Sequence, residues 1–388
     1  MRITAIREKT VALGAAMRNA SIGFGGMTAS AVVVESDLRR GGRPLCGLAF
    51  DSIGRYGHGG LLRERFIPRL LAAAPDDILD TTGANLDPAR AWAIAMRDEK
   101  PGGHGERPGA VGLLDAAIWD LVAKIEEKPL WRVLAERFAG GAAVARVPVY
   151  ASGGHYRDTE DLGALDAEIR RDLALGYTMV KIKIGGASPT EDRRRIETAL
   201  ALLGEGAALA VDCNGTLSRE DAHALSAALA DYGLAWIEEP VDPLDYALHA
   251  DLAAAWPTPL ATGENIFSLA DTRNLLRHAG LRRDRDLLQM DISLSYGVTE
   301  YLRILDLLEG EGWSRQRCLP HAGHLLSLHA VAGLGLGGHE AAPDPQSLIG
   351  GFAEDVVLED GFVRPGEAPG VGIERKANLY AVFCDLLP

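Results

Sequence analysis

The sequence predicts an α/β protein, a modified (β/α)8 TIM barrel preceded by a smaller α+β capping domain. From about residue 144, eight short apolar runs alternate with helical segments, as the strands and helices of such a barrel do. Before that point, residues 1–50 show strand-like patterning and residues 61–138 show helical patterning. The chain has 388 residues, which is too many for one small core.

The capping domain is expected at residues 1–140 and begins with a β meander. Strands are predicted over 2–11, 29–35 and 45–50. Two loops separate or follow these strands, at about 18–28 and 51–60. The first reads NASIGFGGMT from residue 19 and is rich in glycine. Loops of this kind often carry binding residues, so we expect both to determine substrate specificity.

Helices follow these strands in the capping domain. Helical periodicity covers 61–74, and a second helix starts with Asp87 as N-cap and Pro88 at its first position. A long helix is predicted from residue 110 to near Pro129, and a shorter helix follows it.

The barrel is expected at residues 141–349, and residues 350–388 are expected to return to the capping domain. Ser188 and Glu191 have the spacing of a capping box at the start of one barrel helix, which a glycine at Gly204 ends. Another helix is predicted from Ser268 to a stop at Gly280.

A polar residue recurs at the end of each run from the second to the eighth. These residues are Lys183, Asp212, Glu238, Glu264, Asp291, His321 and Glu340. Their spacing up to the seventh run is close to the length of one βα unit. Because the carboxyl ends of barrel strands face the active site, we expect all seven side chains to converge at one mouth.

Three consecutive members of this series are acidic and would repel one another without a cation. Oxygen ligands favour a hard ion, so Asp212, Glu238 and Glu264 predict a Mg²⁺ site rather than a zinc site. Lys181 and Lys183 share one face of the second strand, beside these carboxylates. Buried lysines are normally paired. Desolvation and a nearby cation would lower the pKa of such a lysine toward neutrality, which would make it usable as a base.

Composition excludes several classes of function. The net charge of −14 argues against nucleic acid or an anionic membrane as a partner, although a local positive cluster could still bind an anionic small molecule. The four cysteines have no C-x-x-C spacing, which predicts buried, reduced thiols in a cytoplasmic protein. The start of the chain lacks a signal-peptide pattern, and no apolar run is long enough for a membrane span.

Two weaker motifs are interpreted as structural. The glycine-rich run at 333–338 resembles a dinucleotide fingerprint, but no helix is expected to open after it. His324 and His329 are five residues apart and do not share one helical face, which argues against a zinc site formed with His321. Cys213 is interpreted as core packing.

Three features of the sequence are typical of one known family: the K-x-K of VKIKIG, the three acidic strand ends and the Asp…His pair. The chain resembles the mandelate racemase subgroup of the enolase superfamily over nearly its whole length. Finer features are similar to those of D-tartrate dehydratases. They are EKPGGHGER (99–107), GRYGHGG (54–60), DPLDYAL (242–248), ATGENIFS (261–268) and SLSYG (293–297). The resemblance implies magnesium, an acid-sugar substrate and a homo-oligomer.

The resemblance also implies a role for each member of the series. Asp212, Glu238 and Glu264 would hold magnesium, which would chelate a substrate carboxylate and its neighbouring hydroxyl. Lys183 would remove the proton α to that carboxylate. Lys181 would contact the carboxylate and stabilise its negative charge.

The remaining three residues would complete the reaction. Asp291 would orient His321 and keep it protonated, and His321 would give its proton to the departing 3-hydroxyl. Glu340 would donate, or share, a proton with the carboxylate oxygen. The expected reaction converts D-tartrate to oxaloacetate and water. A racemase or epimerase, a dehydratase of another acid sugar and a non-catalytic metal-binding barrel are the alternatives.

Three residues are candidates for the far end of the substrate. Lys100 could pair with a second carboxylate, and Asn19 or Tyr156 could contact a hydroxyl or a carboxylate. Ile53 departs from the polar residue found at this point in the relatives. An apolar side chain there removes a hydrogen bond, which leaves the choice of acid sugar open.

Overall fold

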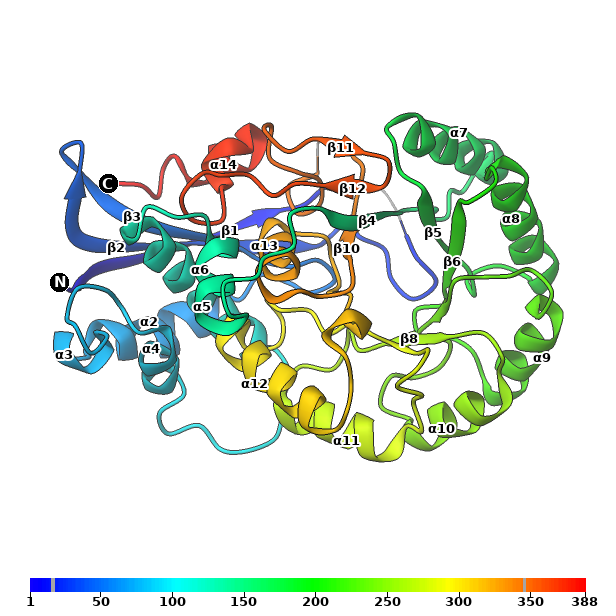
Figure 1. Cartoon of the computed structure of the whole chain (residues 1–388), viewed down its shortest axis with the longest axis horizontal. Coiled ribbons are helices and arrows are strands. Elements are labelled where there is room, and N and C mark those ends of the chain that lie inside the picture. Colours follow the sequence, from blue (N-terminus) through cyan, green and yellow to red (C-terminus); the bar gives the residue numbers. More distant parts are fainter. Residues whose placement is uncertain (15–17, 345–346) are drawn as a thin grey trace.

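The computed structural model describes residues 1–14, 18–344 and 347–388. A three-stranded antiparallel sheet forms one side of the molecule, and the barrel forms the other (Figure 1). The sheet contains β1 (Ile3–Ala12), β2 (Thr28–Arg40) and β3 (Arg43–Phe50). The second strand runs beyond its predicted end because Gly41 and Gly42, at φ 59° and 80°, form a tight hairpin turn into β3.

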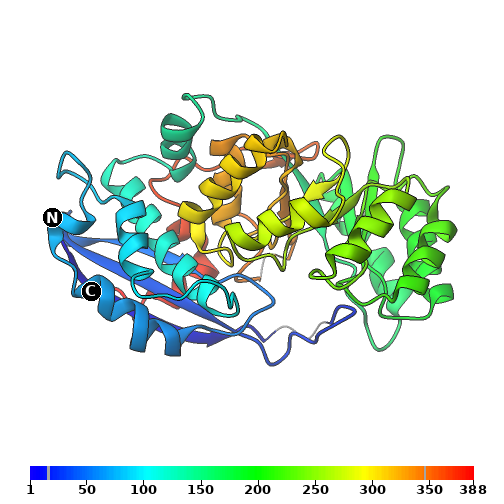
Figure 2. The ribbon, with the colours of Figure 1, turned by 90° about the horizontal axis from the view of Figure 1, so that it is seen from below.

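The helices of the capping domain cover one face of this sheet (Figure 2). The single helix predicted over 61–74 is instead α1 (Gly59–Leu61), a π-helix (Leu62–Phe66) and α2 (Ile67–Leu71), with α3 (Pro75–Ile78) after them. In α4 (Pro88–Ala95), the Asp87 carboxylate accepts the expected N-cap hydrogen bonds from Ala89 and Arg90.

The long helix α5 (Arg107–Ile125) begins three residues before its predicted start and packs tightly on β3. Gly47 permits this contact, because a Cβ at that position would lie 2.0 Å from the Ala117 carbonyl oxygen. The shorter helix α6 (Leu130–Phe138) follows.

Seven short parallel strands form the barrel wall. They are β4 (Val147–Ser152), β5 (Met179–Lys183), β6 (Ala208–Asp212), β7 (Ile237–Glu238), β8 (Leu260–Thr262), β9 (Leu287–Leu288) and β10 (His339–Ala341). From β4 to β9 each strand pairs with the next in the chain, and β10 pairs with β4. This register brings the carboxyl ends of the strands to one side of the barrel.

Helices connect these strands on the outside of the barrel (Figures 1 and 2). They are α7 (Asp161–Ala174), α8 (Pro189–Leu202), α9 (Arg219–Leu229), α10 (Tyr246–Ala255), α11 (Leu269–His278), α12 (Gly297–Gly310) and α13 (Leu325–Leu334). The predicted capping box of α8 is present, with Ser188 and Glu191 bonding reciprocally. The glycine-rich run at 333–338 ends α13, so no helix opens there.

The seventh predicted strand differs from expectation. Between β9 and β10, Cys318 forms one isolated parallel bridge with Leu288 after a 3₁₀-helix (Arg315–Arg317). The Leu319 amide donates to the Leu288 carbonyl at 2.9 Å, and the Cys318 carbonyl accepts from Gly337 at 2.9 Å. Pro320 follows and has no amide to donate, which stops the ladder there.

The end of the chain contacts the barrel before it reaches the capping sheet. After β11 (Leu358–Glu359), β12 (Phe362–Val363) pairs antiparallel with β4. A 3₁₀-helix (Ile373–Arg375) then leads to α14 (Ala377–Phe383), which packs against β2. The Phe383 ring lies 6.5 Å from that of Phe50. The expected return contacts are therefore present, while the boundaries at 140 and 349 stay predictions.

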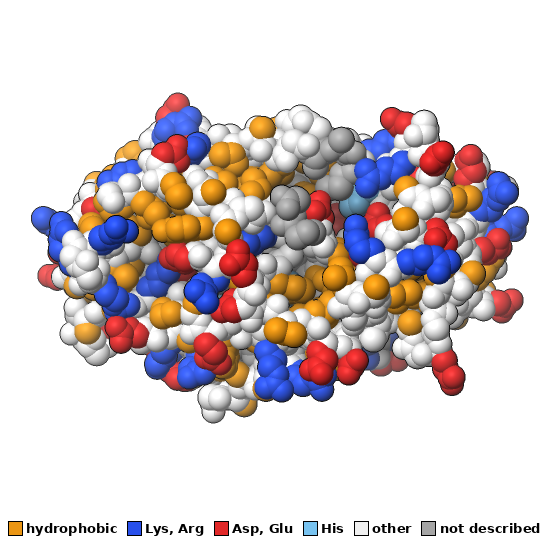
Figure 3. Space-filling view, turned by 90° about the horizontal axis from the view of Figure 1, so that it is seen from above, with side chains coloured by type: hydrophobic (Ala, Val, Ile, Leu, Met, Phe, Trp, Pro, Cys, Tyr) orange, Lys and Arg blue, Asp and Glu red, His pale blue; other side chains and the backbone are white. Residues whose placement is uncertain are grey.

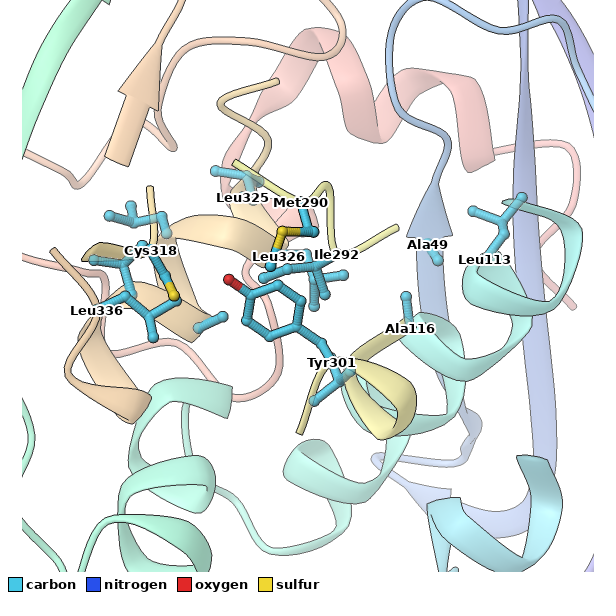
Figure 4. Packing of buried hydrophobic residues seen from close by; sticks show 14 of the residues in the cluster. Ala49, Leu113, Ala116, Met290, Ile292, Tyr301, Cys318, Leu325, Leu326 and Leu336 are labelled. Carbon is cyan, nitrogen blue, oxygen red and sulfur yellow. The ribbon is translucent and has the colours of Figure 1, made fainter. Parts of the chain in front are cut away.

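One apolar core continues from the barrel into the capping domain (Figure 4). Tyr301 of α12 packs among barrel residues such as Met290 and Ile292, and the same cluster includes Ala49 of β3 and Leu113 of α5. This shared core fixes the loops of the capping domain over the barrel mouth.

Three of the four cysteines are buried as predicted, but Cys384 is exposed near the end of the chain. None of the helices in the described residues combines the length and the apolar character needed to cross a membrane. The expected cytoplasmic location and homo-oligomeric state stay predictions.

Candidate active site

The predicted series of polar residues converges at the carboxyl ends of the barrel strands. Lys183, Asp212 and Glu238 are the last residues of β5, β6 and β7, and they are in register with one another. A cavity of about 720 Å³ lies there, between the strand ends and the two loops of the capping domain. Figure 3 shows a histidine side chain among acidic and basic side chains near the middle of this face.

The three carboxylates predicted to bind a metal lie together. Asp212, Glu238 and Glu264 each offer one oxygen atom, and these atoms lie within 4.8 Å of one another. Glu264 Oε2 is buried and has no hydrogen-bond partner. Glu238 Oε2 accepts from Trp236 Nε1 at 3.1 Å and from Gln289 Nε2 at 2.7 Å, which fixes that side chain. Such an oxygen cluster fits a hard divalent cation.

Burial makes these carboxylates costly to ionise together. Burial is the main cause that raises the pKa of Glu238 to about 8; Lys181 opposes the shift, and the negative charge of Asp212 adds to it. A cation among the three groups would remove this penalty, because opposite charge favours the ionised form of each.

The two lysines of β5 are paired charges, as expected. Lys181 is 1% exposed and contacts Glu238, with its Nζ 3.0 Å from Glu340 Oε1 and 3.7 Å from Asp212 Oδ2. Lys183 donates to Asp212 Oδ2.

The expected lowering of the Lys183 pKa by a nearby cation stays a prediction. Burial lowers the pKa of the Lys183 amine, but Asp212 raises it by more, so the net shift is upward. The sequence did not reveal that Asp212 would contact the amine directly.

His321 and Asp291 form the expected pair, with His321 Nδ1 3.0 Å from Asp291 Oδ2. Asp291 also accepts from Ser52 Oγ at 2.5 Å, His324 Nε2 at 3.4 Å and Leu294 N at 3.0 Å. Burial opposes ionisation of Asp291, but its histidine partners hold its pKa well below the usual range. Burial lowers the pKa of His321, but Glu264 and Asp291 raise it by more, so the pKa is raised to about 10.

Glu340 lies opposite Lys181 and accepts from the Ala322 amide at 2.9 Å. Burial raises the pKa of this carboxyl, but Lys181 and His321 lower it by more, so the net shift is downward. The expected donation or sharing of a proton by Glu340 stays a prediction.

Sequence reasoning missed several residues that support the site. Ser52 comes from the capping domain, and nothing in its local pattern distinguishes it from another loop serine. Gln289 has no charge and lies one residue beyond β9. Glu239 and Asn265 directly follow Glu238 and Glu264, so their position beside two predicted ligands was a usable signal. His155 lines the cavity, and burial together with Lys183 lowers its pKa to about 3.

The candidates for the far end of the substrate separate into two groups. Asn19 and Ile53 both line the cavity, although Asn19 Oδ1 already accepts from the Ser21 and Ile22 amides. Lys100 is exposed and does not line it. Glu99, beside Lys100, is held by three arginines, which fixes this loop.

Tyr156 is 4% exposed and does not line the cavity. Its hydroxyl donates to Asp192 Oδ1 at 2.6 Å and accepts from the Gly186 amide at 2.9 Å. The hydroxyl is therefore engaged in holding the turn after β5, and the substrate contact of Tyr156 stays a prediction.

The Tyr156→Phe variant is expected to lose about 1–3 kcal/mol of unfolding free energy, because it leaves the buried Asp192 carboxylate and Gly186 amide without this partner. Urea denaturation measures the loss. Tyr246→Phe is the matched control, since it removes a hydroxyl from a partly buried tyrosine on α10. Equal stability of the two variants would show that the Tyr156 hydroxyl has no structural role.

A family model described as Enolase C-terminal domain-like matches residues 164–378. An L-talarate/galactarate dehydratase of Salmonella typhimurium is 32% identical over 289 residues, which cover 74% of this chain and 67% of that protein. An arabinonate dehydratase of Saccharolobus solfataricus is 27% identical over 278 residues, covering 70% of each chain.

A solved structure is also similar over almost the whole length. It is a racemase from Streptomyces coelicolor A3(2) with bound magnesium, 25% identical, with a TM-score of 0.78 over 97% of this chain and 99% of that one. The strand ends that carry the carboxylate cluster therefore belong to a fold for which a magnesium-bound relative is known.

Proposed function

The chain belongs to the enolase superfamily, through its enolase C-terminal domain-like family, and on this premise we propose that it is a magnesium-dependent acid-sugar dehydratase. One observation carries the proposal. Three carboxylates with oxygens within 4.8 Å of one another lie beside two lysine amines, and a His–Asp pair adjoins them. Lys183, Glu264 and His321 of this group line one cavity. A proton α to a carboxylate is weakly acidic, and this set of charges suits its removal.

The first step is abstraction of the α proton by Lys183. Magnesium held by Asp212, Glu238 and Glu264 would supply positive charge to a substrate carboxylate and so acidify the neighbouring C–H bond. Lys183 takes the proton on Nζ, which requires that the amine first be neutral. Lys181 stays an ammonium, held by Glu238 and Glu340, and offsets negative charge as it develops on the carboxylate.

The second step is loss of the 3-hydroxyl, for which His321 is the acid. Its Nδ1 faces Asp291, so Nε2 faces the carboxylate cluster and lies 3.5 Å from Glu264 Oε2. The C–O bond breaks as Nε2 gives its proton to the departing hydroxyl, and water leaves. The enol that remains tautomerises to a 2-keto-3-deoxy acid, which balances the loss of one water.

The proposed substrate is an acid sugar, with D-tartrate as one candidate on the strength of the loop motifs. The relatives are named for talarate, galactarate and arabinonate, which are longer acids. A cavity of about 720 Å³ is large enough for drug-sized ligands, so size does not restrict the substrate to four carbons.

A racemase or epimerase on the same scaffold is the second candidate, because a relative with a TM-score of 0.78 is named as a racemase. In that reaction His321 would return a proton to the α carbon from the face opposite Lys183, and no hydroxyl would leave.

One experiment separates the two candidates. The protein with Mg²⁺ is incubated in deuterated water with a panel of four- to six-carbon aldonates and aldarates, D-tartrate included. We expect a 2-keto acid from at least one of them, with deuterium at C3 of the product. Recovery of substrate with inverted, deuterated C2 and no keto acid would favour the racemase, and no change in any acid would contradict both.

A further inference from the structure

Arg55 is a positive group of the cavity wall that has no acidic partner among the described residues. It follows Ile53 and Gly54 in the second loop of the capping domain, is half-buried, and lines the cavity. Its hydrogen bonds go to uncharged oxygens, those of Gly54 and Asn265, and no carboxylate of the described residues forms an ion pair with it. By contrast, Arg171 of the same wall pairs with Asp172 at 2.8 Å.

The Arg55 side chain is held in one place. Its Nη1 donates to the Gly54 carbonyl at 2.7 Å, and its Nη2 donates to Asn265 Oδ1 at 2.5 Å. The guanidinium carbon lies 4.9 Å from the centre of the Phe267 ring, so one face of the group is covered. A side chain fixed in this way loses little entropy when it binds a ligand.

A buried carboxylate fixes Asn265 in turn. Glu239 is 1% exposed and accepts from Asn265 Nδ2 at 2.7 Å. With its amide nitrogen engaged there, Asn265 has its oxygen left to accept from Arg55. The same nitrogen lies 3.5 Å from Glu264 Oε1, so Arg55 is one hydrogen bond away from a residue that adjoins a predicted metal ligand.

We propose that Arg55 binds the second carboxylate of a dicarboxylic acid sugar, so that the chain selects diacids over monoacids. This inference rests on the proposed function for the position of the first carboxylate, at the metal ligands. A guanidinium with free N–H donors matches a carboxylate better than any neutral group does. Ile53, beside it on the same wall, offers no competing hydrogen bond. Lys100, the residue expected from the sequence to have this role, does not line the cavity.

Binding can be measured apart from turnover in the Lys183→Ala background with Mg²⁺ present. Calorimetry would compare each diacid with the monoacid of the same configuration: D-tartrate with D-threonate, and galactarate with D-galactonate. We expect at least one diacid to bind about 10- to 100-fold more tightly than its monoacid. Adding Arg55→Gln is expected to remove that difference by weakening the diacid, because glutamine keeps polar atoms but carries no charge.

Arg277→Gln is the matched control, since Arg277 is exposed on α11 and its loss changes the net charge equally. Equal affinity for diacid and monoacid, an equal loss for both with Arg55→Gln, or no binding of either diacid would overturn the inference.

Turnover by the unmodified protein distinguishes failure of the inference about Arg55 from failure of the proposed function. Efficient dehydration of monoacids alone would contradict the role of Arg55 and leave the dehydratase intact. If diacid selectivity depended on Arg55 but no acid of the panel gave a keto acid, the role of Arg55 would stand and the dehydratase would be contradicted.

Discussion

The Lys183→Ala variant is expected to lose keto-acid formation by a factor of about 10²–10⁴, the usual contribution of a general base. The amine lies at the end of β5 in contact with Asp212, and no other lysine lines the cavity in the described part of the chain. No other lysine could therefore replace Lys183 as the base that removes the α proton. The α hydrogen should also stop exchanging with deuterated water, because exchange needs the same step.

Two further measurements show whether the loss of activity is specific to the missing Lys183 amine. Mg²⁺ affinity from calorimetry shows whether the carboxylate cluster survives the loss of its ammonium neighbour. Lys128→Ala is the control, because it removes a partly exposed lysine that pairs with Glu126 and Glu136 and is distant in sequence from the strand ends. This variant should leave turnover unchanged. Continued exchange of the α hydrogen in Lys183→Ala would show that another group is the base.

The convergence of the site was predictable because a barrel repeats. One polar residue per βα unit, at the same end of each strand, can only meet at one mouth, so Asp212, Glu238 and Glu264 were placed without any knowledge of their contacts. The same rule placed Asp291 and His321 at this mouth, and the family resemblance implied their pairing.

Contacts that depend on side-chain distances were not predictable in this way. The upward pKa shift of Lys183 and the downward pKa shift of Glu340 follow from which charges are in contact, and a strand pattern does not contain that information. Ser52 reaches Asp291 from a different domain, 239 residues away in the sequence. No local period relates two such positions.

Loop residues were the least predictable. Lys100 was expected to pair with a second carboxylate of the substrate, yet Glu99 beside it is tied to Arg65, Arg69 and Arg107. The structure brings Arg55 to the wall instead, through a hydrogen bond to Asn265. The seventh strand shortened to one bridge for a local reason, since Pro320 cannot donate.

The His321→Asn variant is expected to separate the two steps of the reaction. Asparagine can still donate to Asp291 but has no proton to give to a leaving hydroxyl, so keto-acid formation should fall by about 10²–10⁴. Lys183 is intact and can still remove the α proton and return one from solvent. Recovered substrate should therefore gain deuterium at C2 with retained configuration, as proton NMR and chiral chromatography would measure.

This pattern distinguishes the proposed division of labour from its reverse. If His321 were the base, His321→Asn would abolish exchange, and Lys183→Ala would be the variant that keeps it. If the protein were a racemase, both variants would lose inversion of the substrate. Neither the variants nor the unmodified protein would then yield a keto acid. His278→Asn, on an exposed histidine at the end of α11, should match the parent in every one of these measurements. Since Nε2 of His321 faces the carboxylate cluster and Nδ1 faces Asp291, we expect the first pattern, exchange without dehydration.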